Sequence, residues 1–495
     1  MKLSEIAACV QGELLGDDVA ISSVSIDTRA IKPGQLYVAI KGRNFDGNEF
    51  VSAAEQAGAA AAIVHPGISV AIPHIVVDDT RLALAELAGA WRRYCRRLSV
   101  VGITGSNGKT TVKEMVAAIL GVQAETLFTQ GNLNNDIGVP LTLLRLTEQH
   151  RYAAIEMGAN HPGEIEYTSQ YVQADVAIIT NVGAAHIEGF GSVDGVAKAK
   201  GEIIQTLKQD GVAVLNRDDA YFDYWKSVAG ARKIMSFGID SAATVTAHSV
   251  KAEIINHAFA TTFELVTEAG VLTINLRLAG RHNVVNALAA TAACLALNID
   301  LQQIKQGLES VKPVTGRLQL LVGRLGSLVI DDTYNANSAS LKAGLDVLKS
   351  CAGKRCLQDG RDPVAVGATT SERDQLLARA PTVNALGDTK AVAEQRELWL
   401  VLGAFGELGP ESPKIHEQMG ELIKSSGVVR LLAVGSEAEN TVNAFGQGAT
   451  FFNNQNDLID VLKQELKGDE AILIKGSRAQ RMENVAAALV ENFRI

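Results

Sequence analysis

The stretch Gly102-Ile103-Thr104-Gly105-Ser106-Asn107-Gly108-Lys109-Thr110-Thr111 decides how this sequence is interpreted. An apolar run precedes it, and apolar residues recur after it at the spacing of one helix face. A strand, a glycine-rich turn and a helix in this order predict a phosphate-binding loop, because backbone N–H groups and the helix N-terminus then face phosphate oxygens. Lys109 can reach the β- and γ-phosphates of a nucleotide, and the Thr110 hydroxyl can ligate Mg²⁺.

The glycine spacing of this loop is G-x-x-G-x-x-G-K-T-T, which differs from the common G-x-x-x-x-G-K-[ST] because Ile103 replaces the first glycine. The alternative is a glycine-rich turn with a chance lysine. The strand, the helix, the lysine and the threonine together favour the nucleotide site. The residues of the loop expected to bind ATP are Gly105, Ser106, Asn107, Gly108, Lys109, Thr110 and Thr111.

Composition indicates a soluble globular protein. The chain has 495 residues, of which 47% are hydrophobic and 20% charged, and a length of this size predicts about three domains. Frequent glycine (45 residues) and few aromatic residues (5%) suit an α/β protein with many tight turns. A net charge of −9 without a basic stripe argues against a nucleic-acid partner.

The cysteines and the N-terminus predict a cytoplasmic protein. Five cysteines are scattered without a C-x-x-C pair, which favours reduced thiols over zinc ligands or disulfides. The first residues lack the apolar core of a signal peptide, and no run of about 18 apolar residues suggests a membrane span. We expect a monomer.

The order of apolar runs predicts three α/β units, at residues 1–82, 83–312 and 313–495. Strands and helices alternate through each unit, as in open α/β sheets, whose ligands lie beyond the carboxyl ends of the strands. Residues 245–278 alternate in polarity instead, which predicts an antiparallel hairpin. Residues of about 356–396 are polar and weakly periodic, and we interpret them as an insertion in the third unit.

Two further features have a chemical interpretation of their own. Glu156 ends a predicted strand, and a carboxylate at that edge can hold Mg²⁺ beside the phosphates. Asn283 and Asn286 share one face of a predicted helix, where their amides can bind the hydrogen-bonding edge of adenine. Helix capping by asparagine is the alternative for this pair.

The loop form resembles that of the Mur ligase family and of the related folylpolyglutamate synthetases, and the resemblance extends over all three units. The segments that carry it, besides the loop, are GNLNNDIGVPLTLL (131–144), EMGANHPGEI (156–165), TNVGAAHIEGFGS (180–192), AKAKGEI (197–203), GRHNVVNALAA (280–290), GRLQ (316–319), DDTYNAN (331–337) and KGSRAQRME (475–483). GNLNNDIG and EMGANHPGEI point to the branch that adds D-alanyl-D-alanine.

The resemblance implies a reaction and a role for each unit. Residues 1–82 would bind the UDP substrate, 83–312 would form a P-loop ATPase domain with a parallel sheet, and 313–495 would form a Rossmann-like domain that binds the incoming dipeptide. The implied reaction joins D-alanyl-D-alanine to UDP-N-acetylmuramoyl-tripeptide through an acyl phosphate. It consumes ATP, with two Mg²⁺ ions, and yields ADP, phosphate and a peptidoglycan precursor.

The resemblance also implies site residues. His186 and Lys200 would join Lys109 and Glu156 as catalytic residues, with His186 and a carbamylated Lys200 as metal ligands beside Thr110 and Glu156; Lys198 is the rival of Lys200. Arg317 and Asp332 would contact ATP, and Asn335, Asn337 and Arg478 the dipeptide. The residues expected to bind the UDP substrate are Ser25, Asp27, Thr28, Arg29, Gly42, Asp46, Gly47, Asn132, Asn134 and Asn135.

Two positions depart from the family pattern. Ala404 stands where the family often has an acid, and Asn48 stands where many relatives have histidine. Two alternatives to the dipeptide-adding ligase therefore stay open. One is another member of the family, which adds the third amino acid or is a folylpolyglutamate synthetase. The other is a non-catalytic P-loop protein, although no guanine-reading N-K-x-D string supports a GTP switch.

Overall fold

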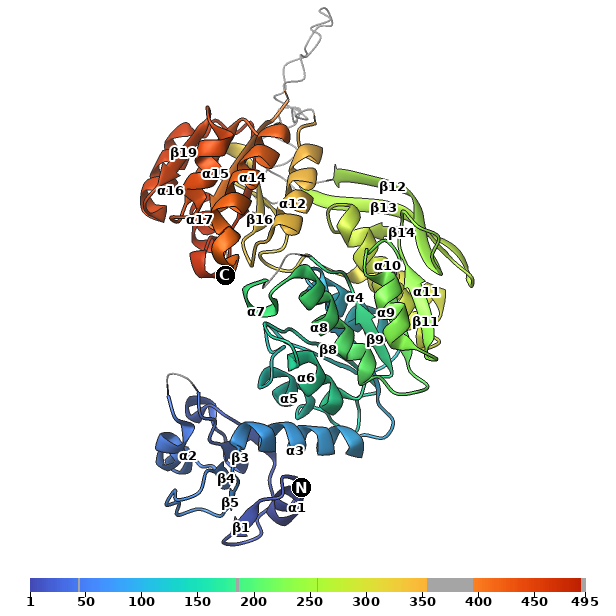
Figure 1. Cartoon of the computed structure of the whole chain (residues 1–495), viewed down its shortest axis with the longest axis vertical. Coiled ribbons are helices and arrows are strands. Elements are labelled where there is room, and N and C mark those ends of the chain that lie inside the picture. Colours follow the sequence, from blue (N-terminus) through green and yellow to red (C-terminus); the bar gives the residue numbers. More distant parts are fainter. Residues whose placement is uncertain (43–44, 184–186, 256, 354–394, 491–495) are drawn as a thin grey trace, which may run out of the picture.

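The computed structural model describes residues 1–42, 45–183, 187–255, 257–353 and 395–490 of the chain. Three sheets lie in three successive units, and the α/β class predicted from the sequence is confirmed (Figure 1). The central unit lies between the other two, and the N-terminal unit stands apart from the C-terminal one. No helix in the described ranges has the length and apolar character that a bilayer crossing needs.

The N-terminal unit is a five-stranded sheet in the order β1-β5-β4-β3-β2, parallel except for β1. Its strands are fully apolar at the centre, where every residue of β4 is buried, and short helices cover them. The elements are α1 (Leu3–Cys9), β1 (Glu13–Leu15), β2 (Ser23–Ser25), η1 (Thr28–Ala30), β3 (Gln35–Val38), η2 (Gly47–Phe50), α2 (Val51–Gln56), β4 (Ala61–Val64) and β5 (His74–Val76).

Helix α3 (Thr80–Tyr94) connects this unit to the next. Asp79 caps the helix by accepting hydrogen bonds from the N–H groups of Arg81 and Leu82. The helix contacts α1 on one side and α5 and α6 on the other, and buried Arg92 donates to the carbonyl of Val172. The boundary expected between residues 82 and 83 falls inside this continuous helix.

The central unit is a nine-stranded sheet in the order β14-β13-β12-β11-β10-β9-β6-β8-β7. The strands from β7 to β12 are parallel, and β12, β13 and β14 are antiparallel, which confirms the hairpin and adds a strand to it. The strands are β6 (Ser99–Thr104), β7 (Thr126–Phe128), β8 (Tyr152–Glu156), β9 (Val176–Ile179), β10 (Val212–Asn216), β11 (Lys233–Phe237), β12 (Val245–Ile255), β13 (Ala258–Thr267) and β14 (Gly270–Leu276).

Helices cover both faces of this sheet, because its parallel strands are apolar on both faces. One face packs against α4, α10 and α11, and the other against α5, α6, α8 and α9. The helices are α4 (Lys109–Gly121), α5 (Gly138–Leu143), α6 (Glu164–Val172), α7 (Ile187–Phe190), α8 (Val193–Gln205), α9 (Phe222–Ala229), α10 (Arg281–Ala296) and α11 (Leu301–Ser310).

The C-terminal unit is a six-stranded sheet in the order β15-β16-β20-β17-β18-β19, parallel except for β15. Helices lie on both of its faces, as in the predicted Rossmann-like arrangement. The elements are β15 (Gln319–Val322), η3 (Arg324–Gly326), β16 (Leu328–Asp332), α12 (Ser338–Ser350), β17 (Glu397–Gly403), η4 (Gly409–Glu411), α14 (Ser412–Ser425), β18 (Arg430–Val434), α15 (Ala438–Phe445), β19 (Ala449–Phe452), α16 (Gln455–Glu465), β20 (Glu470–Lys475), η5 (Arg478–Gln480) and α17 (Glu483–Leu489).

The predicted insertion lies almost wholly outside the described residues, which resume just before β17. Of the cysteines, Cys9, Cys95, Cys294 and Cys351 lie within the described ranges, and all four are free thiols, as expected.

Candidate functional site

The predicted phosphate loop connects the carboxyl end of β6 to the first turn of α4. Gly105 and Gly108 have positive φ angles of 145° and 82°. A Cβ atom would lie 1.9 Å from Thr180 Oγ1 at the first position and 2.4 Å from Asn286 Oδ1 at the second. Glycine is therefore required at both positions, for its backbone conformation and because no Cβ atom would fit. Thr180, just after β9, and Asn286, on α10, therefore pack directly against the two glycines.

The end of β9 fixes the backbone of the loop at Asn107. Thr180 Oγ1 donates to the carbonyl of Asn107 at 2.6 Å, and Asn181 Nδ2 donates to the same oxygen at 3.1 Å. The N–H of Asn107 donates to Asn181 Oδ1 at 3.0 Å. Ser106 and Gly183 exchange a further pair of hydrogen bonds. These contacts fix the backbone of the loop.

Lys109 folds back over its own loop. Its Nζ donates to the carbonyls of Gly105 at 2.8 Å and of Ser106 at 3.3 Å. Burial lowers the pKa of Lys109, the carboxylate of Glu156 opposes that shift, and the nearby charge of Arg317 adds to it. A phosphate group in the loop would provide this ammonium with an anionic partner in place of the two carbonyls.

The Thr110 hydroxyl and the Glu156 carboxylate form the predicted metal pair. Thr110 Oγ1 donates to Glu156 Oε2 at 2.9 Å, and Asn134 Nδ2 donates to Glu156 Oε1 at 2.8 Å. Glu156 is only 2% exposed, at the carboxyl end of β8. Within the described residues no three histidine, cysteine or acidic side chains cluster as a metal cage. One carboxylate and one hydroxyl nevertheless fit Mg²⁺, which takes few protein ligands when phosphates supply the others.

The predicted adenine-binding pair lies beside the loop. Asn283 and Asn286 are buried near the start of α10 and line the same cavity as the loop. Asn283 Nδ2 donates to the carbonyl of Ala279 at 2.8 Å, and Asn286 Nδ2 donates to Asn283 Oδ1 at 3.0 Å. Neither caps the helix, whose N-cap is Gly280.

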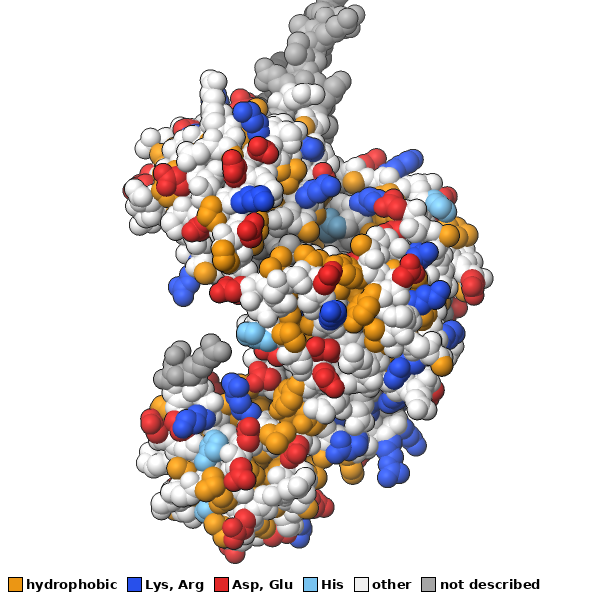
Figure 2. Space-filling model, viewed as in Figure 1, with side chains coloured by type: hydrophobic (Ala, Val, Ile, Leu, Met, Phe, Trp, Pro, Cys, Tyr) orange, Lys and Arg blue, Asp and Glu red, His pale blue; other side chains and the backbone are white. Residues whose placement is uncertain are grey.

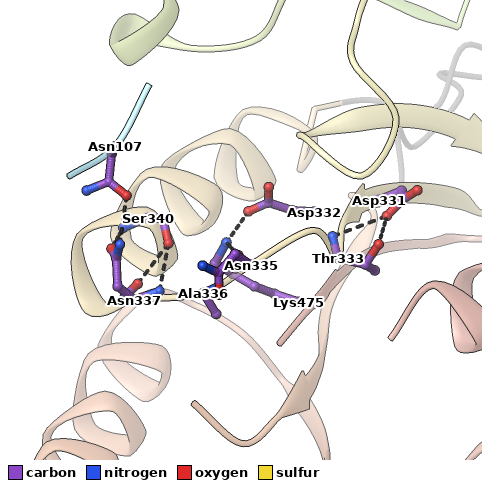
Figure 3. A network of polar contacts seen from close by, with 9 residues as sticks. All are labelled: Asn107, Asp331, Asp332, Thr333, Asn335, Ala336, Asn337, Ser340 and Lys475. Atoms are coloured by element: carbon purple, nitrogen blue, oxygen red, sulfur yellow. Dashed lines mark hydrogen bonds and ion pairs between the residues drawn. The ribbon is translucent and has the colours of Figure 1, made fainter. Parts of the chain in front are cut away.

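The C-terminal unit contributes polar groups at the carboxyl ends of β16 and β20 (Figure 3). Lys475 Nζ contacts Asp332 Oδ2 at 2.5 Å and donates to the carbonyl of Asn335 at 3.1 Å. Asn337 caps α12 and donates from Nδ2 to Oδ1 of Asn107 in the phosphate loop at 2.7 Å. The third and second units therefore meet directly at the predicted nucleotide site.

A cavity of about 690 Å³ lies where the two units meet. Arg317 closes one wall by donating from Nη2 to Thr110 Oγ1 at 2.9 Å. The predicted residues that line this cavity are Ser106, Asn107, Gly108, Lys109, Thr110, Thr111, Asn134, Asn135, Glu156, Asn283, Asn286, Arg317, Asp332, Asn335, Asn337 and Arg478.

Other lining residues were not assigned from the sequence. Lys475 and Tyr334 belong to segments that carried the family resemblance, and their position at or just beyond the carboxyl end of a buried strand was the available signal. His282 also lines the cavity, where burial lowers its pKa to about 4 despite the opposing charge of Asp332. The histidine is therefore neutral near pH 7.

The predicted UDP-binding residues of the N-terminal unit do not line this cavity. Asp27 pairs with Arg29 through hydrogen bonds of 2.9 and 2.8 Å, and these bonds lower the pKa of Asp27 to about 2. Asp46 accepts from the N–H of Asn48 and approaches Lys41 at 3.5 Å. The other residues predicted to bind the UDP substrate that do not line the cavity are Ser25, Thr28, Gly42, Gly47 and the exposed Asn132. Figure 2 shows the surface hollowed between this unit and the rest of the molecule.

The two residues that depart from the family pattern, Asn48 and Ala404, are both buried and hydrogen-bonded. Asn48 is buried, accepts a hydrogen bond from the N–H of His65, and contacts the Nδ1 atom of the same histidine at 2.8 Å. Ala404 is buried after β17, and its carbonyl accepts from Ser477 Oγ at 2.7 Å. The side-chain bonds of Asn48 explain that residue, whereas the bond at Ala404 involves only its backbone and does not explain the alanine.

The structure distinguishes the two lysines of α8. Lys200 is 2% exposed, with Nζ 5.4 Å from the ring centroid of Phe190, whereas Lys198 is exposed. Burial lowers the pKa of Lys200 to about 7, and the charge of Lys109 contributes. His186 lies outside the described residues.

Three family models match the chain. The Mur ligase middle domain matches residues 103–294, the catalytic domain of the Mur ligase family matches 20–92, and the glutamate ligase domain of Mur ligase matches 378–478. The chain is 41% identical over 493 residues to UDP-N-acetylmuramoyl-tripeptide–D-alanyl-D-alanine ligase of Escherichia coli K12, which covers 99% of this chain and 98% of the relative. It is 31% identical over 506 residues to the Bacillus subtilis 168 protein of the same name, covering 99% and 98%.

Solved structures are similar over the same length. MurF from Acinetobacter baumannii has a TM-score of 0.84 at 34% identity and covers 98% of this chain and 97% of that one. MurF ligase from Thermotoga maritima, solved in complex with ADP, has a TM-score of 0.76 at 26% identity and covers 96% and 98%. The similarity is therefore to whole proteins, not to one domain.

Proposed function

Because this chain belongs to the Mur ligase family, we propose that it joins D-alanyl-D-alanine to UDP-N-acetylmuramoyl-tripeptide at the expense of ATP. The products are ADP, phosphate and the UDP-linked pentapeptide, a precursor of peptidoglycan. The observation that carries this proposal is the single cavity in which the phosphate loop, the Thr110–Glu156 pair and the asparagines of the C-terminal unit meet. A ligase needs this arrangement, because ATP, acid and amine must react in one place.

The first chemical step is attack of the tripeptide carboxylate on the γ-phosphorus of ATP. An oxygen–phosphorus bond forms, the bond to the β-phosphate oxygen breaks, and ADP leaves. Repulsion between the two anions opposes this step, and Lys109 offsets it by moving its ammonium from the loop carbonyls to the phosphates. Arg317 reaches the same region from the C-terminal unit.

A bound magnesium ion would supply charge neutralisation at the phosphates. Thr110 and Glu156 are the described residues that would hold it, because the carboxylate is buried, already orientated by Asn134 and paired with the hydroxyl. We assign His186 and Lys200 to a second ion. For Lys200 this requires carbamylation, in which the neutral amine nitrogen attacks CO₂ and loses a proton to solvent. A pKa near 7 supports this assignment, because much of the amine is then neutral.

In the second chemical step, the amine of the dipeptide attacks the acyl phosphate and phosphate leaves. Asn335, Asn337 and Arg478 are the proposed dipeptide residues, and all three line the cavity on the side of the C-terminal unit. Water must be kept out of this space, because it would hydrolyse the acyl phosphate. Closure of the C-terminal unit on the phosphate loop is the expected means.

We assign the UDP end of the substrate to the N-terminal unit and the muramoyl peptide to Asn132, Asn134 and Asn135. The support is geometric, since Asn134 contacts Glu156 while the proposed UDP residues of the N-terminal unit do not line the cavity. A long substrate can bridge that separation.

We further propose residues 1–82, 83–312 and 313–495 as the three functional domains of a cytoplasmic monomer.

Phosphate release by the purified protein tests the proposal. With Mg²⁺ and ATP, release should require both UDP-N-acetylmuramoyl-tripeptide and D-alanyl-D-alanine, and mass spectrometry should find the pentapeptide product. A diamino acid or glutamate in place of the dipeptide should give none. Release that does not depend on the dipeptide, or that follows glutamate instead, would refute the assignment.

A further inference from the structure

The ring of Tyr334 lies against the guanidinium groups of two arginines that line the cavity. The Cζ atom of Arg317 is 4.2 Å from the ring centroid, and that of Arg478 is 6.0 Å from it. Arg317 precedes β15, Tyr334 follows β16, and Arg478 begins η5, so three separate segments converge on one ring. The ring thus connects the proposed phosphate arginine with the proposed dipeptide arginine.

Among the residues that the structure describes, no acidic side chain forms an ion pair with Arg317. Its Nη2 donates to the Thr110 hydroxyl, and within the described part of the chain its buried Nε has no hydrogen-bond partner. An aromatic face attracts a cation through its quadrupole and leaves the N–H donors at the guanidinium edge available. The positive charge and the unpaired donor of Arg317 therefore remain available to phosphate oxygens. A carboxylate partner would have competed with the phosphate for the same guanidinium.

The backbone fixes the ring relative to Arg317. The N–H of Tyr334 donates to the carbonyl of Gly316 at 3.0 Å. Gly316 has a φ of 72°, and a Cβ atom there would lie 3.2 Å from that same nitrogen. The residue next to Arg317 and the residue that carries the ring are thus hydrogen-bonded to each other, so the backbone positions from which the guanidinium and the ring extend are fixed relative to each other.

We propose that Tyr334 is a positioning residue of the ligation reaction, whose ring holds Arg317 towards the phosphates and helps to hold Arg478 towards the dipeptide. Arg478 is also held by an ion pair with Glu483 at 3.1 Å. This inference rests on the proposed function. The ring face performs the task, and the hydroxyl has no part in it. Loss of the ring should therefore weaken the use of both ATP and dipeptide, whereas loss of the hydroxyl alone should not.

Steady-state kinetics of Tyr334→Leu, Tyr334→Met and Tyr334→Phe test this inference. Replacing the ring by leucine or methionine should lower kcat/KM for ATP by about fivefold to thirtyfold, the range of a partly desolvated cation–π contact. A smaller loss is expected for the dipeptide, because Arg478 is farther from the ring. The phenylalanine variant should retain most of the activity. Tyr94→Leu, at an exposed tyrosine on α3 away from the cavity, is the matched control.

A double-mutant cycle with Arg317→Ala separates positioning from a merely structural role. If the ring acts through Arg317, adding Tyr334→Leu to Arg317→Ala should cause little further loss in kcat/KM for ATP. If the losses in kcat/KM of the two single variants multiply in the double variant, the inference is overturned. Full activity of Tyr334→Leu and Tyr334→Met would also overturn it, and so would a loss in Tyr334→Phe as large as that in Tyr334→Leu. Melting temperatures of all variants are measured, and a leucine variant that does not fold leaves the methionine variant for the comparison. A wild-type protein without dipeptide-dependent phosphate release would refute the proposed function instead.

Discussion

Asn337 donates a hydrogen bond from Nδ2 to Oδ1 of Asn107 at 2.7 Å, and this bond joins the start of α12 to the phosphate loop (Figure 3). The same side chain accepts from the N–H of Ser340 at 2.9 Å and so caps the helix. One amide therefore stabilises a helix of the C-terminal unit and connects that unit to the nucleotide site. A change in the loop on nucleotide binding can reach the dipeptide residues through this contact.

Replacing Asn337 should separate these two tasks. Asn337→Ala removes both and should lower the free energy of unfolding by about 1 kcal/mol, as loss of an N-cap does. Asn337→Ser keeps a capping oxygen but cannot reach Asn107, so it should retain stability and lose ligation rate several-fold. Urea unfolding and steady-state kinetics measure the two effects. Asn454, which caps α16 away from the cavity, is the control: Asn454→Ala should lose stability but not rate. Unchanged kinetics in Asn337→Ser would mean that the bond to Asn107 has no role in turnover.

Lys109→Ala should abolish ATP-driven ligation. Removing one preorganised group that stabilises transition-state charge costs about a hundredfold or more in rate. Binding of the UDP end of the substrate should remain nearly intact, because the residues of the N-terminal unit that are proposed to bind it do not line the cavity. Phosphate release and calorimetry with the UDP substrate measure the two. An equal loss of both would contradict the separation of the two sites.

Lys200 should make stability depend on pH when its amine is unmodified. Its folded pKa of about 7 lies below the unfolded value of 10.5, so between these values only the unfolded chain holds the proton. The free energy of unfolding should therefore rise with pH across this window, by a few kcal/mol in total, and be lowest below about pH 7. Urea unfolding in CO₂-depleted buffer measures this slope. Lys200→Met should remove it and Lys198→Met should not; the same slope in wild type and Lys200→Met would show that the group titrates normally.

The sequence predicted the three α/β units and the antiparallel hairpin within residues 245–278. Continuous apolar residues indicate buried parallel strands, and β9, β17 and β20 are of this kind. The edge strands β1, β7, β15 and β19 lack this signal, because their residues are only partly buried and no continuous apolar run is needed. The expected boundary at residue 82 lies inside α3, and a helix that contacts two units shows no break in its periodicity.

The candidate site was predictable where one segment carries a complete signal. The loop around Lys109 and the carboxylate of Glu156 are such cases, since the loop directly follows β6 and Glu156 is the last residue of β8. Contacts between distant segments were not predictable. The bond from Arg317 to Thr110 joins residues 207 positions apart, and no local pattern specifies it. Lys475 was missed for the same reason, because its partner Asp332 is 143 positions away.

Transfer of an oxygen isotope tests the central claim most directly. The tripeptide carboxylate of UDP-N-acetylmuramoyl-tripeptide is labelled with heavy oxygen and ligated to D-alanyl-D-alanine with ATP and Mg²⁺, and the released phosphate is analysed by mass spectrometry. If the carboxylate attacks the γ-phosphorus held by the phosphate loop, a single labelled oxygen should appear in the phosphate for each amide bond formed. Amide formation with unlabelled phosphate would contradict the account, because the acid would then not have been activated by phosphorylation.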